Sequence, residues 1–517
     1  MARSRKPEPK PNVWQRAASW MRSHWQDLLI IGVLALITGV VTGTNLGSYP
    51  MRFEDEGTYV AQAWAVQKQG ELAHYTYWYD HPPAAWIQLA IYTTITFAFE
   101  RQESAIEAGR EFMLLMHVLS VIILYAIARR LAMGKVVAVV VSLLFALSPL
   151  SVEFSRLVLL DNIALPWMLG AFLLALSPKR HLWTIAASAV FMAVAVLSKE
   201  TFLIFLPALI YMIYQHSDVR NRRFVFLLFG VIFTLLVASY ALLAALKNEL
   251  FPGEGHVSLI GTVLWQLFGR EGSGSILDAG SDARGLLTFW LDIDTWLLGL
   301  GVILTPLAFI RRQFRPIALA LLIGLVMMLR GGYLPYPYII ALLPLASLVI
   351  GAVLTTFLVE PIQRGKGISA RIAEVLAVVV ALGGLYFVAP AWQAGISEAM
   401  TRNADESSKQ AVAWVLENVP RDQRMVVESA LWVDLQTKGF DQPDPVWLYK
   451  TETDPEVQAE IDGWQGIDYI VLNGPTLDES SRGAFPTVFE AKDNAEVVAE
   501  FGENELKVIV MKVNNGR

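Results

Sequence analysis

The sequence has no cysteine among its 517 residues, and only seven histidines. The absence of cysteine excludes disulfide bonds and thiolate metal sites. Charged residues are also scarce: they make up 17% of the chain, whereas 55% of it is hydrophobic. A soluble protein of this length would lack the polar residues to cover its surface, so the composition indicates a membrane protein. The formal net charge of −6 does not favour a nucleic-acid partner.

Two regions of different composition divide the chain. Apolar segments recur from residue 28 to about 392, which predicts a transmembrane domain over 27–392 after a basic cytoplasmic segment, 1–26. The basic start, MARSRKPEPKPNVWQR, lacks an obvious cleavage site, so the first apolar run is interpreted as a retained span. Within 393–517, one amphipathic segment (SSKQAVAWVLENVP) and four strand-like segments (RMVVES, IDYIVLNG, AEVVAEFG and LKVIVMKV) predict a small α/β accessory domain.

Basic residues set the expected number of spans. The apolar segments that could cross a bilayer are 28–44, 84–99, 112–128, 136–150, 162–176, 182–197, 201–215, 224–246, 294–310, 316–329, 333–359 and 372–392. Arg and Lys concentrate in 3–22, 128–135, 177–181, 218–224, 311–315 and 360–371. If 84–99 lies along the membrane interface without crossing, all of these basic segments are cytoplasmic, as the positive-inside rule requires. We therefore expect an α-helical protein with eleven transmembrane helices in the plasma (inner) membrane, and an extracytoplasmic C-terminal domain.

Under this topology, the ionisable residues near span ends gather on the extracytoplasmic side. They lie in a first external loop (45–110), at later span ends and in a long external loop (247–293): Asp55, Glu56, Asp80, His81, Arg110, Arg156, Asp161, Lys199, Glu200, His256 and Arg330. Charges at membrane depth are costly and tend to line a cavity, so we expect a polar cavity at the outer leaflet. The loop 247–293 joins an amphipathic piece to a glycine-rich piece, which is typical of a lid or of a flexible connection.

Several of these residues lie in ordered motifs that resemble a known superfamily. The segments DEGTYVAQAWAVQKQGELAH, YDHPPAAWIQLA, RLVLLDNIALPWMLGAFLLAL and LSKETFLIFLPALI are similar to those of the GT-C membrane glycosyltransferases. The nearest branches are the protein O-mannosyltransferases and the bacterial aminoarabinose transferases of lipid A. The resemblance implies transfer of a sugar from a polyprenyl-phosphate donor to an acceptor on the outer face, with eleven to thirteen spans. The acceptor, a protein hydroxyl or an envelope lipid or glycan, stays open.

The resemblance also implies catalytic roles for two adjacent carboxylates. Asp55 matches the residue that acts as general base, and Glu56 matches its partner, whereas Glu54 is expected to be solvated or to lie at a helix start. Such a displacement needs a base for the acceptor hydroxyl and cations for the leaving phosphate. The candidates for the donor phosphate are Arg110, Lys199, Arg330 and Tyr333. For Arg110, the alternative is a side chain that anchors its helix at the interface.

The remaining polar residues are candidates for a substrate pocket: Asp80, His81, Arg156, Asp161 and Glu200. Arg156 and Asp161 are five residues apart with opposite charges, which also suits a structural ion pair. His256 is a candidate ligand of a divalent cation, together with Asp80 or His81. No other cofactor is indicated.

Two other classes of function remain compatible with the sequence. A transporter of a lipid-linked or small polar solute would also have many spans with buried charges, but it typically has internal repeats and charges at the bilayer midplane. A non-catalytic scaffold would not need the paired carboxylates. We therefore expect an enzyme whose partners are a polyprenyl-phosphate sugar, an acceptor protein or lipid, and membrane lipids.

Overall fold

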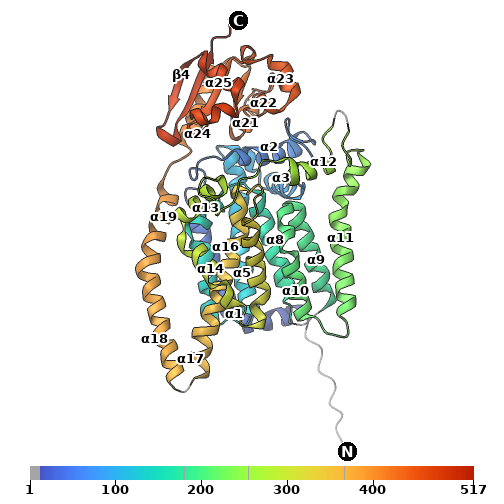
Figure 1. The fold of residues 1–517 in the computed structure, drawn as a ribbon, viewed down its shortest axis with the longest axis vertical. Helices are drawn as coiled ribbons and strands as arrows, with labels where there is room; N and C mark the ends of the chain where they lie inside the picture. The colour runs from blue at the N-terminus through green and yellow to red at the C-terminus, as the bar shows by residue number, and fades with distance from the viewer. Residues whose placement is uncertain (1–11, 179–180, 254–255, 366, 517) are drawn as a thin grey trace, which may run out of the picture.

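The computed structural model describes residues 12–178, 181–253, 256–365 and 367–516. Its long helices form a bundle with the C-terminal domain at one end (Figure 1). Two helices of the first loop, α2 (Glu54–Lys68) and α3 (Ala84–Thr96), lie between the bundle and this domain (Figure 1). The 13-residue α3 is the segment that the basic residues predict to lie at the interface.

Each predicted span corresponds to a helix of the bundle. These are α1 (Val13–Gly43), α5 (Ala105–Arg130), α6 (Lys135–Leu147), α8 (Leu160–Ala175), α9 (Leu182–Ser198), α10 (Leu206–His216), α11 (Arg222–Leu246), α14 (Thr295–Ala308), α15 (Arg315–Met328), α16 (Leu342–Leu354) and α18 (Ile368–Gly383). Shorter elements connect them: α4 (Ala98–Arg101), α7 (Pro149–Phe154), η1 (Glu200–Phe205), α12 (Leu259–Leu264), η2 (Trp265–Gly269), α13 (Asp282–Ile293), η3 (Arg312–Phe314), η4 (Tyr336–Ala341), η5 (Thr355–Val359), α17 (Glu360–Arg364), η6 (Gly384–Val388) and α19 (Ala389–Thr401).

Helix length does not confirm the predicted count of eleven spans. In the described part of the chain, five helices are long and apolar enough to cross a membrane, or six if α13 and α14, which meet at 111°, form one broken span. Others are short; α6 has 13 residues, which as a helix reach about 20 Å against a hydrocarbon core of about 30 Å. The apolar helices indicate a multi-pass membrane protein, without fixing the exact number of spans.

Burial distinguishes the centre of the bundle from its edge. In the most apolar part of the helix that contains α16, 89% of the residues are buried, against 11% for α11 and 6% for the helix that begins with α18. A helix that is apolar on all sides needs an apolar environment on all sides. The protein supplies that environment for α16, whereas α11 and α18 expose apolar side chains that suit contact with lipid.

The basic segments meet at the end of the bundle away from the C-terminal domain. Asp27 near the middle of α1 forms ion pairs with Arg129 and Lys135, on either side of the α5–α6 turn. Arg311 pairs with Glu360, and the Gln313 side chain donates to the Leu131 carbonyl. These contacts bring three of the basic segments, 128–135, 311–315 and 360–371, together at one end of the bundle, as the positive-inside argument expects.

The C-terminal domain is the predicted α/β unit. Its five-stranded sheet has the order β2-β1-β3-β5-β4, where β1 (Met425–Val427) pairs in parallel with β2 (Val446–Trp447) and β3 (Tyr469–Asn473). β5 (Val508–Val513) runs antiparallel to β3 and to β4 (Ala495–Phe501). The predicted amphipathic helix is α20 (Glu406–Asn418). The other helical elements are α21 (Ser429–Gln436), α22 (Lys450–Thr453), α23 (Pro455–Ile461), η7 (Trp464–Gly466), α24 (Gly474–Leu477), η8 (Glu479–Gly483), α25 (Pro486–Asp493) and η9 (Asn504–Leu506).

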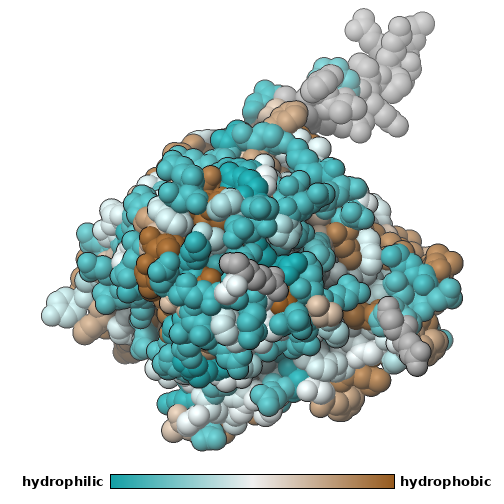
Figure 2. Space-filling model, turned by 90° about the horizontal axis from the view of Figure 1, so that it is seen from above, coloured by the Kyte–Doolittle hydropathy of each residue, from teal (hydrophilic) through white to brown (hydrophobic). Residues whose placement is uncertain are grey.

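Viewed from the C-terminal domain, the end of the molecule is mainly hydrophilic, with hydrophobic residues in patches, several of them at the rim (Figure 2). The sides of the bundle, by contrast, expose large apolar residues such as Leu235 and Val379. This distribution suits a protein whose bundle lies in lipid and whose C-terminal domain lies in water.

Candidate active site

Three successive carboxylates form the first turn of α2. The backbone N–H of Phe53, the residue before the helix, donates to the Glu56 carboxylate at 3.0 Å, which closes the first turn. Negative charge at a helix N-terminus is also stabilised by the helix dipole. The acidic motif is therefore a helix start, and the alternative of a helix N-terminal position for Glu54 is confirmed.

Glu56 and Arg110 form a fully buried ion pair. The Arg110 Nε and Nη2 atoms donate to the two Glu56 carboxylate oxygens at 2.9 and 2.8 Å. Glu56 Oε1 also accepts from the Val158 N–H at 2.9 Å, and Arg110 donates to the Leu46 carbonyl at 3.2 Å. Neither side chain has exposed surface. The roles predicted for them, catalytic partner and phosphate ligand, would require this pair to separate.

Asp55 lies in a different environment one residue earlier. It is partly buried in the first turn of α2, with His81 nearby, and the cations Lys199 and Arg270 are close enough to stabilise its charge. Burial is the largest influence, so the pKa of the Asp55 carboxyl is raised above its usual 3.8 even though Lys199 lowers it. Asp55 is thus a carboxylate that can exchange a proton at a higher pH than an exposed one.

His81 joins Lys199 and Glu200 into a hydrogen-bonded chain beside this carboxylate. The Lys199 Nζ atom lies 3.1 Å from His81 Nε2, and His81 Nδ1 lies 3.2 Å from the Glu200 carboxylate. Because an ammonium group can only donate, His81 Nε2 accepts from Lys199 and Nδ1–H donates to Glu200. Lys199 lies between the end of α9 and the start of η1. Its hydrogen bond to His81 therefore holds the lysine side chain at the end of the helix bundle.

Two other predicted pocket residues lie near this chain. Asp161, in the first turn of α8, is buried within electrostatic range of Lys199 and Glu200. Asp80 accepts a hydrogen bond from the Tyr77 N–H at 3.2 Å. Burial raises the pKa of the Asp80 carboxyl, and His81 and Lys450 act in the opposite direction. The structure thus brings together six of the predicted residues: Asp55, Asp80, His81, Asp161, Lys199 and Glu200.

Arg270 belongs to this group, although the sequence does not single it out. It follows the amphipathic part of the long external loop, and its guanidinium carbon lies 3.4 Å from the centre of the Tyr333 ring. It also acts electrostatically on Asp55. Tyr333 therefore holds a cation near the site, whereas Arg330 is exposed. The sequence offers one indication of Arg270, its place between an amphipathic segment and a glycine-rich segment. That indication does not predict where the side chain lies, because this depends on how the loop folds.

The predicted ion pair between Arg156 and Asp161 is wrong. The fully buried Arg156 guanidinium donates instead to backbone carbonyls, those of Val41 and Thr44 at the end of α1 and that of Ala399 in α19. It therefore satisfies acceptors at helix ends and does not face a substrate pocket. Arg156 lies in the turn between α7, which ends at Phe154, and α8, which begins at Leu160 and contains Asp161.

His256 does not assemble with Asp80 and His81 into a metal site. Its exposed ring lies 3.3 Å from the Phe251 carbonyl. In residues 12–178, 181–253, 256–365 and 367–516, no group of three or more His, Asp or Glu side chains is placed to hold a metal ion.

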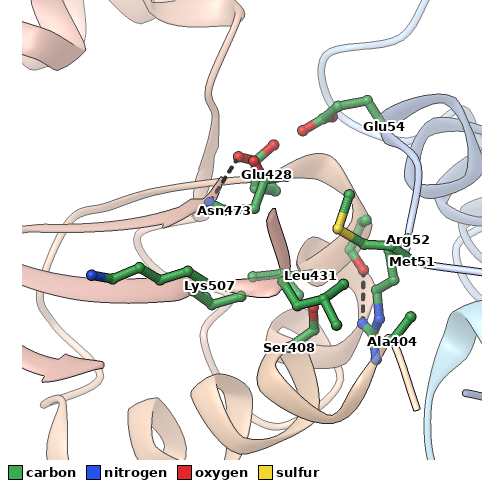
Figure 3. Close-up of a pocket in the computed structure, with 12 residues that line it drawn as sticks. Met51, Arg52, Glu54, Ala404, Ser408, Glu428, Leu431, Asn473 and Lys507 are labelled. Atoms are coloured by element: carbon green, nitrogen blue, oxygen red, sulfur yellow. Dashed lines mark hydrogen bonds between the residues drawn. The ribbon is translucent and has the colours of Figure 1, made fainter. Parts of the chain in front are cut away.

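The C-terminal domain holds the start of α2 through an arginine. Arg52 donates to Asp405 at 2.7 and 3.0 Å and to Asp434 at 2.9 Å, and all three side chains are buried. Such charge-assisted bonds in a buried setting are stronger than exposed ones. In the close-up of this interface, Arg52 extends among residues of the C-terminal domain (Figure 3).

Glu54 faces the same interface. Its carboxylate accepts hydrogen bonds from the backbone and side chain of Ser429, at the start of α21. It also points toward Glu428, which accepts from the Asn473 N–H at 3.4 Å (Figure 3). Burial and the adjacent Glu428 raise the pKa of Glu54 well above its usual 4.5. The loop helix that carries Asp55 is therefore fixed by side chains of the C-terminal domain.

The fold and a central segment of the sequence are similar to known proteins. A family model described as dolichyl-phosphate-mannose-protein mannosyltransferase matches residues 80–243, whereas no curated protein sequence matches. The crystal structure of ArnT from Cupriavidus metallidurans bound to undecaprenyl phosphate is similar with a TM-score of 0.61 at 14% identity, over 94% of this chain and 98% of that one.

A second solved structure shares the same architecture. The archaeal oligosaccharyltransferase AglB from Archaeoglobus fulgidus, in complex with an inhibitory peptide and a dolichol-phosphate, is similar with a TM-score of 0.58 at 13% identity. The similarity covers 90% of this chain and 71% of AglB. The chain therefore has the fold of these two membrane proteins, and its segment 80–243 matches the mannosyltransferase family model.

Proposed function

We propose that the protein transfers a sugar from a polyprenyl-phosphate donor to an acceptor hydroxyl on the extracytoplasmic face of the plasma membrane, with Asp55 as general base. The observation that carries this proposal is the position of Asp55. It is a partly buried carboxylate at the start of α2, with Lys199, His81 and Arg270 around it. A base and cations in one place are what the displacement of a phosphate from a sugar requires.

In the proposed reaction, the acceptor oxygen attacks the anomeric carbon of the donor sugar. The acceptor proton passes to the Asp55 carboxylate, the new carbon–oxygen bond forms, and the bond to the phosphate oxygen breaks with its electron pair. The products are the glycosylated acceptor and polyprenyl phosphate. General-base help of this kind typically contributes about 10²–10⁴ in rate.

Lys199 and Arg270 are the groups that we assign to the leaving phosphate. Lys199 is held by the His81–Glu200 chain, and Arg270 is held over the Tyr333 ring. A guanidinium presents a planar fork that suits phosphate oxygens. We assign the donor phosphate to these two residues and not to Arg110, because the Arg110 guanidinium is already bound to Glu56. We assign Arg110 and Glu56 to fixing α2 against α5.

The donor class is supported by what the similar structures bind. ArnT was solved with undecaprenyl phosphate and AglB with a dolichol-phosphate and a peptide. Both ligands are polyprenyl phosphates, the leaving group of the proposed reaction. The proposed donor carries either a hexose or a pentose.

The test is consumption of labelled donor by the purified protein. We expect wild-type protein in detergent to release label from at least one member of a panel of undecaprenyl-phosphate hexoses and pentoses. Arg270→Ala should weaken donor binding by at least about tenfold, because the phosphate loses a ligand. Arg284→Ala, an exposed arginine of the same external region, is the matched control and should bind normally. Donor that binds to wild type but is never consumed would contradict the proposal.

A further inference from the structure

A second polar space lies away from the Lys199–Arg270 group. This cavity, of about 620 Å³, is enclosed by the approach to α2, by α7, α13 and α19, and by the 505–506 turn of the C-terminal domain. We call it the α13–α19 cavity. Its size is that of a binding site for a small molecule or head group. Neither Lys199 nor Arg270 lines it.

Aromatic rings form one wall of the α13–α19 cavity. Tyr336 stacks on Phe53 with ring centres 4.8 Å apart, and Phe289 lies 5.8 Å from the same tyrosine ring. All three residues line the cavity, as does Tyr49. Flat rings that offer apolar faces and phenolic hydroxyls suit a ligand with both C–H and O–H groups, such as a sugar ring.

The charges of the cavity disfavour a phosphate. Its carboxylates are Glu153, Asp292, Glu398 and Glu505, and its cations are Arg52 and Arg402. Arg52 is bound by Asp405 and Asp434, and Arg402 donates to Glu398 at 2.6 Å. No uncommitted cation is therefore present among the lining residues, all of which the structure describes. Glu153 already accepts from the Tyr49 hydroxyl at 3.0 Å and Glu398 from Arg402, so Asp292 and Glu505 are the carboxylates left to accept hydrogen bonds from the hydroxyl groups of a ligand.

The cavity extends to the residue that precedes α2, although Asp55 itself does not line it. Phe53, one of its aromatic residues, immediately precedes α2, and Asp55 is in the first turn of that helix. A ligand in the cavity and a phosphate held by Lys199 and Arg270 would thus approach the start of α2 from two different directions. This is the arrangement that transfer between two substrates needs.

We propose that the α13–α19 cavity is the acceptor site and that the acceptor presents an uncharged, polyhydroxylated group, a sugar or sugar-like head group. This inference rests on the proposed function. Of the acceptors that the sequence leaves open, a protein hydroxyl or an envelope lipid or glycan, this inference favours a glycan or a glycolipid with an uncharged head group.

The test uses two photoreactive probes on the full-length protein in neutral-lipid nanodiscs. One is a diazirine-bearing dodecyl maltoside and the other is dodecyl phosphate with the same diazirine. Labelled peptides are identified by mass spectrometry, and donor consumption is measured in parallel. The variant Ala391→Trp fills the cavity from α19, and Ala394→Trp, on an exposed position of the same helix that does not line it, is the control. A milder variant, Asp292→Asn, removes one carboxylate charge from the wall.

We expect the maltoside probe to label cavity residues of α13 and α19 at least about tenfold more than the phosphate probe. Ala391→Trp should abolish this labelling, Asp292→Asn should reduce it, and Ala394→Trp should leave it unchanged. Equal or stronger labelling by the phosphate probe would overturn the inference. Maltoside labelling that is unchanged in both Ala391→Trp and Asp292→Asn would overturn it as well. A wild-type protein that labels as expected but never consumes donor would contradict the proposed function, and with it the acceptor role of the cavity, but not the preference of the cavity for an uncharged sugar over a phosphate.

Discussion

At the residue scale, three adjacent carboxylates have three different environments because they are adjacent on a helix. Successive residues of an α-helix point about 100° apart. Glu54 consequently faces Ser429 and Glu428 of the C-terminal domain, Asp55 faces Lys199 and His81, and Glu56 faces Arg110. Of the three, the middle carboxylate is therefore the one that we assign to a substrate, as the family resemblance implies, whereas the partners of Glu54 and Glu56 are not evident from the sequence.

The position of Lys199 predicts how turnover depends on pH. Burial raises the pKa of Asp55 and Lys199 lowers it. A protonated Asp55 cannot act as base, so turnover should fall as the pH drops through this pKa, which lies above 3.8. Lys199→Met removes the cation, so the pKa should rise further and the acidic limb of kcat at saturating donor should move to higher pH. Lys68→Met, at an exposed lysine paired with Glu100, is the control. If the acidic limb of the kcat profile stays at the same pH in Lys199→Met, Lys199 does not influence the pKa of Asp55.

Sequence reasoning succeeds for residues whose position follows from topology. Asp55, His81, Lys199 and Glu200 all lie at span ends on one side, so charge distribution alone places them together. It does not predict the pairing of Arg110 with Glu56, because these residues are 54 apart in sequence and nothing local indicates the contact. It fails for Arg270 because the fold of a glycine-rich loop decides where the side chain lies.

At the scale of elements, the central contact is that between α2 and α21 of the C-terminal domain. A Cβ at Gly57 would lie well under 3.0 Å from the backbone of Ser429 and Ala430. The two helices can therefore approach each other only because residue 57 is glycine. This contact, with the Arg52 ion pairs, couples the domain to the helix that carries Asp55.

Gly57→Ala should separate the two helices, because backbone atoms cannot move aside as a flexible side chain can. We expect faster proteolysis of the 402–405 connection and slower donor consumption in the same variant. Gly32→Ala, where a Cβ meets nothing within 4 Å, should change neither rate. Normal activity with normal protease resistance in Gly57→Ala would show that this docking is not needed.

At the scale of the whole molecule, the charge distribution predicts which segments share an end of the bundle better than apolar length predicts spans. The contacts Asp27–Arg129 and Gln313–Leu131 gather basic segments at one end, and the site and the C-terminal domain occupy the other (Figure 1). Helices such as α6, α8 and α9 are too short to be recognised as spans by length. Neighbouring helices supply the apolar environment of these short helices, and such packing between distant segments cannot be deduced from the length of one segment.

Sidedness can be tested with single cysteines, since the native chain has none. Gln102→Cys lies at the end of α4, after the segment expected not to cross, and should react with an impermeant thiol reagent added from outside. Asp218→Cys, between α10 and α11 at the opposite end of the bundle, should react only after permeabilisation. Reaction of the Gln102→Cys variant only from the cytoplasmic side would overturn the topology.

The most direct test of the central claim, that Asp55 is the general base, compares binding and turnover in one variant. Asp55→Asn keeps the shape of the side chain but cannot accept the acceptor proton. It should bind labelled donor like wild type and lose at least about 10² in donor turnover. Glu71→Gln, an exposed carboxylate of the same loop, should retain both. Wild-type turnover in Asp55→Asn would contradict the mechanism, because the acidic start of α2 would then be structural only.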